Sequence, residues 1–377
     1  MYKLYCRVRS FRALMAAITL CLATAAFADA RPLHGRVTNS DGQPLAGLTV
    51  KLFDPDAHAL TAEYALATAT TESNGGFTLG DGHTGELLVQ VTGDDGAGRV
   101  LAAADQTELS VTYPVRTEIW LLHDNDHHFT FNYMGPFRDA VNEYREQYED
   151  VFLLNAGDFF VRHQDRWHEP YEEHYFRRAS GMIALMNAFE YDVATPGNHE
   201  FQYYGDFTRT ALEMAEFPLV AANMEITTDK LPQFEDYTVL VTSNLYTIAV
   251  LGISTGGGMD GVTRHSRIGT AQQYRHLADA HALFVALTHI GVNTDRELAE
   301  AMPELDIIIG GHSHTLLEEA EMVNGVLVAQ AGGHPHPMDY EVPNFLGIIR
   351  VVLENGEVVE KEGHVLQFGG EEDGGDD

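Results

Sequence analysis

The sequence predicts an α/β domain preceded by a small all-β domain, and three features of the chain lead to this expectation. From residue 117 onward, apolar runs typical of buried strands alternate with stretches whose apolar residues recur at helical spacing. Before that point, short β-rich runs are separated by turns that contain glycine, asparagine and aspartate. In the second region, candidate metal ligands directly follow the apolar runs, and open α/β sheets bind ligands at the carboxyl ends of their strands. We therefore expect the second region to carry the function.

Residues 1–28 have the form of a secretory signal peptide. A positively charged start is followed by an apolar stretch over residues 13–26, and Ala26 and Ala28 form an A-x-A-like cleavage site. A transmembrane anchor is the alternative, but the stretch is shorter than the roughly 20 apolar residues that a spanning helix needs. We expect a periplasmic or secreted protein. Since both cysteines lie in this segment, the exported chain would have no disulfide and no thiolate metal ligand.

The chain is strongly acidic, with 23 lysine and arginine residues against 56 aspartate and glutamate residues and a formal net charge of −33. Such a surface repels nucleic-acid phosphates, so the composition argues against a protein that binds duplex nucleic acid. After the signal segment, no run is long and apolar enough to span a membrane. Residues 368–377 are dominated by glycine and acidic residues, and we expect them to form a disordered tail.

Residues 31–115 are expected to form a small β-sandwich, because several short β-rich runs follow one another without helical periodicity. The string HGRVTNSDGQPLAGLTV at residues 34–50, followed by TESNGGFTL at residues 71–79, resembles the carboxypeptidase regulatory-like (transthyretin-like) domain. Domains of that kind are seldom catalytic. The resemblance therefore implies a structural or adhesive module, and the sequence does not identify its partner.

Residues 117–367 are expected to form the α/β domain. Its first strand is predicted at residues 118–123 and its second at 150–158, with helices predicted at 135–148 and 177–189. Further strands are predicted at residues 192–197, 217–224, 246–254, 282–289, 305–311 and 326–332, and a final hairpin over 345–359 should turn at Asn355 and Gly356.

Seven residues with the chemistry of metal ligands stand at the ends of these predicted strands. They are Asp126 and His128 in HDNDHH, Asp158 in NAGD, Asn198 in GNHE, His289 in LTHIG, and His312 and His314 in GGHSH. Taken alone, each one has an ordinary alternative, such as a surface loop, a helix cap or a core histidine. As an ordered set of histidine nitrogens and hard oxygens they predict a site for divalent ions. The donor types fit Zn, Mn, Fe or Co, and the identity of the metal stays open.

The five motifs resemble those of the calcineurin-like metallophosphoesterases, and HDNDHH with GNHE and GGHSH is similar to the 5′-nucleotidase branch. The resemblance implies a four-layer αββα sandwich, in which two β-sheets are flanked by helices. It also implies two metal ions. One would be held by Asp126, His128, Asp158 and His314, and the other by Asp158, Asn198, His289 and His312, with Asp158 as the bridge.

Two metal ions can activate a water molecule as hydroxide and polarise phosphoryl oxygens, so hydrolysis needs no serine or cysteine nucleophile. His199, which directly follows Asn198, is the candidate general acid for the leaving oxygen. The alternative for His199 is an additional ligand or a mere neighbour of the site. The related motif reads GNHEFD, whereas this chain has Gln202 at the position of the last aspartate. A neutral amide supports the cationic imidazole less well, so we expect altered pH dependence or a lower rate.

The sequence leaves the substrate open, because we expect the C-terminal domain that clamps the base in nucleotidases of this type to be absent. Trp167, Tyr203 and Tyr204 could instead line the mouth of the site and stack on a substrate ring, although a surface loop that packs on its own aromatic residues is an equal alternative.

The predicted function is that of an exported dimetal phosphoesterase, which hydrolyses small phosphate mono- or diesters, including 5′-nucleotides. One alternative is a sulfur-ester hydrolase of the same branch, against which the intact GNHE motif argues. Another is a non-catalytic surface or binding protein that retains a metal site, and the complete set of ligand residues argues against it.

Overall fold

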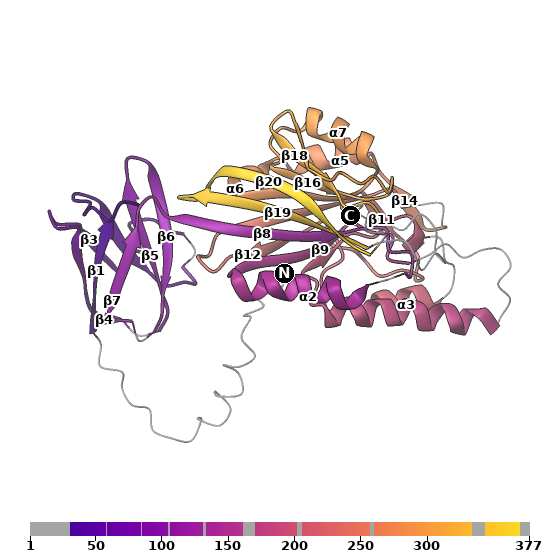
Figure 1. Ribbon diagram of the computed structural model, residues 1–377, viewed down its shortest axis with the longest axis horizontal. Helices are drawn as coiled ribbons and strands as arrows, with labels where there is room; N and C mark the ends of the chain where they lie inside the picture. The colour runs from indigo at the N-terminus through magenta and orange to yellow at the C-terminus, as the bar shows by residue number, and fades with distance from the viewer. Residues whose placement is uncertain are drawn as a thin grey trace, which may run out of the picture. The chain divides into compact units, whose positions relative to one another are not determined.

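The computed structural model describes residues 31–369 apart from short gaps, which are 58, 84, 105, 131–132, 161–169, 202–205, 257–259 and 334–343. The predicted signal segment and the acidic residues from 370 onward lie outside the described part. The chain separates into two compact units (Figure 1). The first includes the chain up to Thr117 together with Val241–Tyr246 and Leu353–Glu357, and the second contains the remainder.

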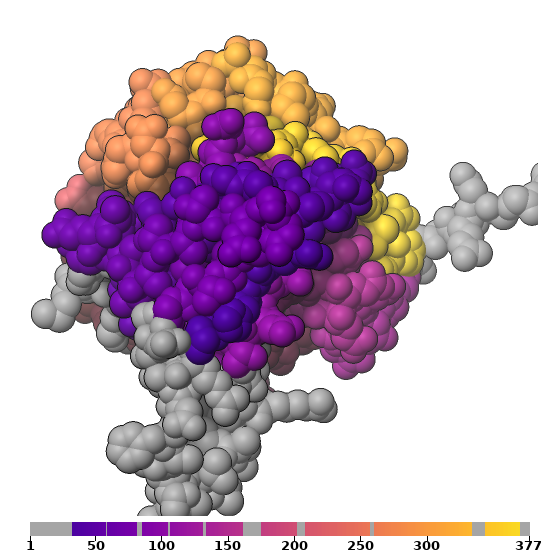
Figure 2. Space-filling view, turned by 90° about the vertical axis from the view of Figure 1, so that its left-hand side faces the viewer, coloured from indigo at the N-terminus to yellow at the C-terminus, as the bar shows by residue number. Residues whose placement is uncertain are grey.

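The first unit is a β-sandwich, as expected for this region. One sheet has the strand order β4-β1-β7 and the other β3-β2-β5-β6. Its strands are β1 (Arg31–Thr38), β2 (Thr49–Phe53), β3 (Ala67–Thr70), β4 (Gly76–His83), β5 (Leu87–Gly93), β6 (Gly96–Ala102) and β7 (Glu108–Thr112). Alternate apolar residues of both sheets share one buried core, which includes Val37, Val50, Leu79 and Val89. Figure 2 shows one face of this unit in a space-filling view, where its residues are coloured indigo to purple.

The second unit contains two larger sheets. One has the order β10-β9-β8-β19-β20, in which β8, β9 and β10 run parallel. The other has the order β12-β13-β15-β16-β18-β17, in which β13, β15, β16 and β18 run parallel. The strands of the first are β8 (Arg116–Asp124), β9 (Asp150–Asn155), β10 (Val193–Ala194), β19 (Asn344–Glu354) and β20 (Glu357–Phe368). Those of the second are β12 (Tyr237–Val241), β13 (Thr247–Ser254), β15 (Leu283–His289), β16 (Ile307–Gly310), β17 (Glu321–Val323) and β18 (Val326–Gln330).

Helices cover the outer faces of both sheets (Figure 1). The main helices are α2 (Met134–Gln147), α3 (Pro170–Ala188), α5 (Arg267–Ala271), α6 (His276–Ala280) and α7 (Val292–Ala301). Residues of α2 and α3 share a core with β8 and β9, and residues of α5, α6 and α7 share a second core with β13, β15 and β16. The intervening residues of β15 and β16, Val285, Leu287, Ile307 and Ile309, are also fully buried, and by strand alternation they point between the sheets. The layers are therefore αββα, which confirms the expected fold.

Smaller elements complete the second unit. They are η1 (His199–Phe201), α4 (Asp206–Leu212), β11 (Met224–Ile226), β14 (Val262–Arg264) and η2 (Gln272–Tyr274).

One of the predicted strands is wrong. Of residues 217–224, predicted as a strand, only Met224 belongs to one, as the first residue of β11, and the preceding residues make only isolated bridges at Leu219 and Val220. The chain turns before β11, with the Met224 amide donating to the Ala221 carbonyl at 3.1 Å, so most of the apolar run is buried without entering a ladder. The hairpin turn at Asn355 and Gly356 is confirmed, and both residues have positive φ (52° and 94°).

The core under β15 should control the stability of the second unit. Phe284 is fully buried among the residues of α6 and α7, so Phe284→Ala is expected to lower the free energy of unfolding by about 3–5 kcal/mol. Equilibrium urea unfolding measures this loss. Met322→Ala is the control, because the Met322 side chain on β17 is 54% exposed and its removal should cost little. A loss below about 1 kcal/mol in Phe284→Ala would contradict the packing described here.

Candidate active site

The seven predicted ligand residues lie at or just beyond the carboxyl ends of strands from both sheets of the second unit. Asp126 and His128 follow β8, Asp158 follows β9 and Asn198 follows β10. His289 is the last residue of β15, while His312 and His314 follow β16. In parallel strands these ends meet at one edge of the sheet, which is why residues distant in sequence come together here. Ligand atoms of six of the seven form groups within 4.8 Å of one another.

The backbone at this edge is held in an unusual conformation. Five of the seven residues have positive φ, a region that side chains other than glycine rarely adopt. The values are 55° at Asp126, 48° at His128, 53° at Asp158, 79° at His312 and 51° at His314. Each such residue costs of the order of 1–3 kcal/mol, so the surrounding contacts must impose the conformation. Strain gathered in this way is characteristic of functional sites.

The first group consists of Asp126, His128 and His314. Asp126 Oδ1 lies 3.3 Å from His314 Nε2 and 3.8 Å from His128 Nε2, and the two histidine Nε2 atoms are 3.2 Å apart. Asp126 Oδ1 is buried and accepts no hydrogen bond within the described structure. Burial lowers the pKa of His128 to about 4, which leaves its imidazole neutral with a lone pair available. An acceptor oxygen and two imidazoles therefore converge on one point.

The second group consists of Asp158, His289 and His312. His289 Nδ1 donates to the Ala156 carbonyl at 2.7 Å, which orients the ring so that Nε2 faces Asp158 Oδ2 at 3.1 Å. Although close, these two atoms are not aligned for a hydrogen bond, and Nε2 is a buried atom without a partner. Burial alone would lower the pKa of His289, but the carboxylates of Asp158 and Asp126 raise it to about 10. The site thus demands positive charge, which a divalent ion can supply as well as a proton.

The two groups are joined by a third, formed by His128, Asp158 and His199. His199 donates its backbone N–H to Asp158 Oδ1 at 2.8 Å, and its Nε2 lies 3.7 Å from Asp158 Oδ2. Its ring stands edge-on to His128, with centroids 4.6 Å apart. Burial lowers the pKa of His199, yet 18% of its side chain remains exposed. His199 thus lies at the boundary of both groups and is open to a bound molecule.

Gly157, which directly precedes Asp158, is required by the close packing of the loops around it. It has φ 88°, and a Cβ at this position would lie 2.6 Å from His289 Nδ1 and 2.8 Å from the Gly197 amide. Protein atoms therefore fill the space. The glycine allows the loops after β9, β10 and β15 to close upon each other.

Glu200 is a residue of this site that the sequence did not single out. Its carboxylate is completely buried and accepts three backbone N–H groups, from Gly197 at 2.6 Å, Phe160 at 2.8 Å and Asp158 at 3.1 Å. It thereby ties the loop that carries Asp158 to the loop that carries Asn198. Burial and the neighbouring Asp158 raise its pKa to about 8. The only sequence signal is its place in the GNHE motif.

Asp124 and Asn125 support the loop after β8 in a similar way. Asp124 is buried and accepts from Asn155 Nδ2 at 2.7 Å, from His127 Nε2 at 2.9 Å and from the Tyr191 hydroxyl. Asn125 Nδ2 donates to Asp126 Oδ2 at 2.6 Å, and Asn125 Oδ1 accepts from the Ala331 amide at 3.0 Å. Both residues stand beside the predicted ligands in HDNDHH, but their partners lie up to 207 positions away.

The remaining predicted residues are placed as follows. Asn198 Oδ1 lies 3.5 Å from Thr255 Oγ1, at the end of β13. Trp167, Tyr203 and Tyr204, together with Gln202, lie outside the described residues. Tyr175 belongs to the same aromatic stretch as Trp167, but it is fully buried and packs on Phe129 with ring centroids 5.1 Å apart. It is therefore a core residue and not a substrate contact.

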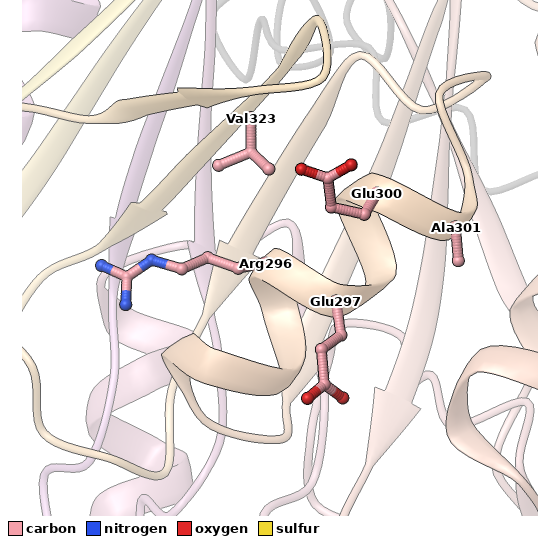
Figure 3. Close-up of a pocket in the computed structure, with 5 residues that line it drawn as sticks. All are labelled: Arg296, Glu297, Glu300, Ala301 and Val323. Atoms are coloured by element: carbon pink, nitrogen blue, oxygen red, sulfur yellow. The ribbon is translucent and has the colours of Figure 1, made fainter.

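An open hollow elsewhere on the second unit does not belong to this site. It lies between α7 and β17 and is lined by Arg296, Glu297, Glu300, Ala301 and Val323 (Figure 3). Arg296 is paired with Glu321 at 2.8 Å, so its charge is already compensated.

Glu200 should act on metal binding through the loops that it joins. Glu200→Gln removes one acceptor oxygen and places an amide N–H against backbone N–H groups, so metal affinity is expected to fall about 10- to 100-fold. Competition with a fluorescent chelator measures the affinity without reference to turnover. Asp192→Asn is the matched control, since Asp192 accepts the Leu153 amide at 2.8 Å away from the ligand groups and its replacement should leave affinity within about twofold. Equal affinities in the two variants would contradict the role of Glu200.

Comparison with known proteins agrees with this geometry. The chain is 28% identical over 298 residues to the trifunctional nucleotide phosphoesterase protein YfkN of Bacillus subtilis, an alignment that covers 66% of this chain and 19% of that protein. It is 24% identical over 261 residues to the NAD 5′-nucleotidase of Haemophilus influenzae, covering 60% of this chain and 40% of the relative. The crystal structure of a 5′-nucleotidase precursor from Thermus thermophilus shares the fold, with a TM-score of 0.56 at 23% identity over 67% of this chain and 55% of that one.

This chain therefore spans less than two thirds of the length of each of these relatives. The family match is to the calcineurin-like phosphoesterases and extends over residues 119–316, just over half of the 377 residues. Because that match includes every strand end from Asp126 to His314, this chain belongs to the calcineurin-like phosphoesterase family.

Proposed function

We propose that this chain is an exported phosphoesterase that holds two divalent metal ions and hydrolyses small phosphate esters, with 5′-nucleotides as the first candidates. The observation that carries the proposal is the pair of buried, partnerless acceptor atoms, Asp126 Oδ1 and His289 Nε2, each at the centre of a group of candidate ligands. A structural role does not account for such an arrangement, because buried acceptors without partners destabilise a fold.

The donor set fits two sites that share one carboxylate. Asp126, His128, Asp158 and His314 would hold one ion, and Asp158, Asn198, His289 and His312 would hold the other. Nitrogen and oxygen donors without thiolates suit Zn, Mn, Fe or Co. When bound, such ions lower the pKa of water and stabilise the charge of a phosphoryl group.

His199 would serve as the general acid. Hydrolysis forms a bond from a water oxygen to phosphorus and breaks the bond to the leaving oxygen, which then needs a proton. His199 lies at the junction of both groups with part of its ring exposed, so Nε2 can reach an oxygen there. The hydrogen bond from the His199 backbone N–H to Asp158 Oδ1 fixes the position of His199 relative to the carboxylate that both metal sites would share.

Nucleotides are proposed as substrates because the names of two relatives refer to them, the nucleotide phosphoesterase of Bacillus subtilis and the NAD 5′-nucleotidase of Haemophilus influenzae. Trp167, Tyr203 and Tyr204 are proposed to stack on the base. The acidic composition argues against duplex nucleic acid as a partner.

Export is proposed from the signal-like residues 1–28, which would place the protein in the periplasm or outside the cell. In the described part of the chain, no helix is both long and apolar enough to cross a membrane. The β-sandwich, proposed to be of the carboxypeptidase regulatory-like type, would be a structural or adhesive module.

Removal of metal should abolish activity. Dialysis against a chelator is expected to reduce hydrolysis of p-nitrophenyl phosphate to background, and added Mn, Zn or Co should restore it, because the groups that bind phosphate would be the ions. Turnover that persists in metal-free protein would overturn the proposal. Two bound ions without turnover on a panel of phosphate mono- and diesters would also overturn it, and a thiosulfate ester on the panel tests the sulfur-ester alternative.

The variant His199→Ala should show whether His199 acts as a proton donor or as a metal ligand. We expect a fall in kcat of about 100-fold or more, while the metal content stays unchanged. His265→Ala is the control, because His265 is an exposed histidine paired with Glu225 at 3.1 Å and should not affect kcat. A kcat within about twofold of the unmodified protein would exclude His199 as the general acid.

A further inference from the structure

Two arginines beside the second ligand group lack a carboxylate partner. Arg264 is the last residue of β14 and Arg267 the first residue of α5. Neither forms an ion pair with any described carboxylate. Several other arginines of the second unit are paired with carboxylates, as in Arg209–Glu213, Arg275–Glu304, Arg296–Glu321 and Arg350–Glu118. In a chain with 56 acidic residues against 23 basic ones, two arginines three positions apart that lack an ion pair require a reason.

Arg264 is linked to the candidate ligand Asn198 through Thr255. Its Nη1 donates to the Thr255 carbonyl at 2.8 Å, and Thr255 Oγ1 lies 3.5 Å from Asn198 Oδ1. Thr255 also donates its amide to the carbonyl of His289 at 3.0 Å. Since Thr255 is the residue after β13, the guanidinium lies at the same strand edge as the ligand groups. One donor of Arg264 is engaged, while its side chain is otherwise exposed.

The segment that carries Arg264 is anchored firmly to this edge. Val262–Arg264 pairs with Met224–Ile226, and the next amide, of His265, donates to the Asn223 carbonyl at 2.8 Å. Asn223 in turn exchanges two side-chain hydrogen bonds with Ser254, both of 2.8 Å. The backbone position of Arg264 is therefore fixed relative to the end of β13, and only its side chain has freedom to adjust.

Arg267 lies beside the helix that follows His289. Its Nη1 lies 3.5 Å from Thr294 Oγ1 in the first turn of α7, the helix that begins three residues after His289. The charge of Arg267 is also among the influences that lower the pKa of His312, after burial and His289. His312 is the exposed member of its ligand group, so Arg267 lies near the open side of the site.

We propose that Arg264 and Arg267, named here the arginine rim, bind a second phosphate of the substrate while the scissile phosphate occupies the metal groups. This inference rests on the proposed phosphoesterase function and specifies its substrate class as phosphate compounds with a further phosphate beyond the one cleaved. A guanidinium presents a planar fork of donors that matches phosphate oxygens, and its charge is not lost at any physiological pH. The rim also gives an anionic substrate a local attraction that the acidic surface as a whole does not provide.

The reaction on such a substrate balances as ordinary hydrolysis. For a nucleoside diphosphate, a water oxygen bonds to the terminal phosphorus, the bridging P–O bond breaks, and the bridging oxygen leaves with the inner phosphate. That leaving phosphate gains negative charge as the bond breaks. Arginines that contact it stabilise the transition state as well as the bound substrate.

The test compares ADP with p-nitrophenyl phosphate, which has no second phosphate, in the metal-loaded full chain. In the double variant Arg264→Gln, Arg267→Gln, the ratio of kcat/KM for ADP to kcat/KM for p-nitrophenyl phosphate is expected to fall about tenfold or more, since two charge-assisted hydrogen bonds are lost. The ratio of kcat/KM for AMP to kcat/KM for p-nitrophenyl phosphate should fall less than the corresponding ratio for ADP. Replacement of both residues by lysine should restore part of the ADP ratio, because charge returns without the fork.

Arg275→Gln is the matched control, since it removes one exposed arginine that is already paired with Glu304 at 3.3 Å. It should leave the ADP ratio unchanged. A double variant whose ADP ratio stays within about twofold of the unmodified protein would overturn the arginine rim. Failure of the unmodified, metal-loaded protein to hydrolyse p-nitrophenyl phosphate would instead overturn the proposed function, so the two failures are distinguishable.

Discussion

The convergence of buried acceptors at one edge of the α/β unit is the constraint on which the rest of the structure depends. Asp126 Oδ1 and His289 Nε2 are buried without hydrogen-bond partners, and Asp158 Oδ2 lies 3.1 Å from the latter. Negative and lone-pair atoms in such proximity repel one another and are poorly solvated. Positive charge must be supplied between them, and the pKa of His289, raised to about 10 by the two carboxylates, reflects that demand. A pair of divalent ions would satisfy it and would supply the chemistry proposed for this site.

The scaffold holds this unfavourable arrangement by hydrogen bonds between loops of both sheets. The Asp126 amide donates to the Gly157 carbonyl at 2.8 Å, and the His312 amide donates to Asp126 Oδ2 at 2.9 Å. Glu200 adds three bonds that close the loops after β9 and β10 against each other. The cores under the two sheets fix the strand ends from which these loops begin. Packing far from the site thus stabilises the positive-φ residues within it.

Much of this could be predicted from the sequence, because strand and helix periodicity is local and metal ligands are chemically distinctive residue types. The αββα layers and the seven residues at strand ends are examples. Other features depend on distant contacts. The role of Glu200 requires knowledge that residues 158 and 197 meet, and Asp124 finds Tyr191 across 67 positions. Residues 217–224 have the composition of a strand, but Pro218 and a local turn keep most of them out of the ladder. Tyr175 lies in the same aromatic stretch as the candidate substrate contact Trp167, yet it is a core residue in the fold.

The central claim, that these converging acceptors exist to hold two ions with Asp158 shared, is tested most directly by counting metal in the purified full chain. Elemental analysis should find two equivalents of divalent metal per chain. In Asp158→Asn the count should fall below one, because the shared carboxylate serves both ligand groups. A chain that binds no metal under saturating conditions, or an Asp158→Asn variant that keeps two equivalents, would contradict the account.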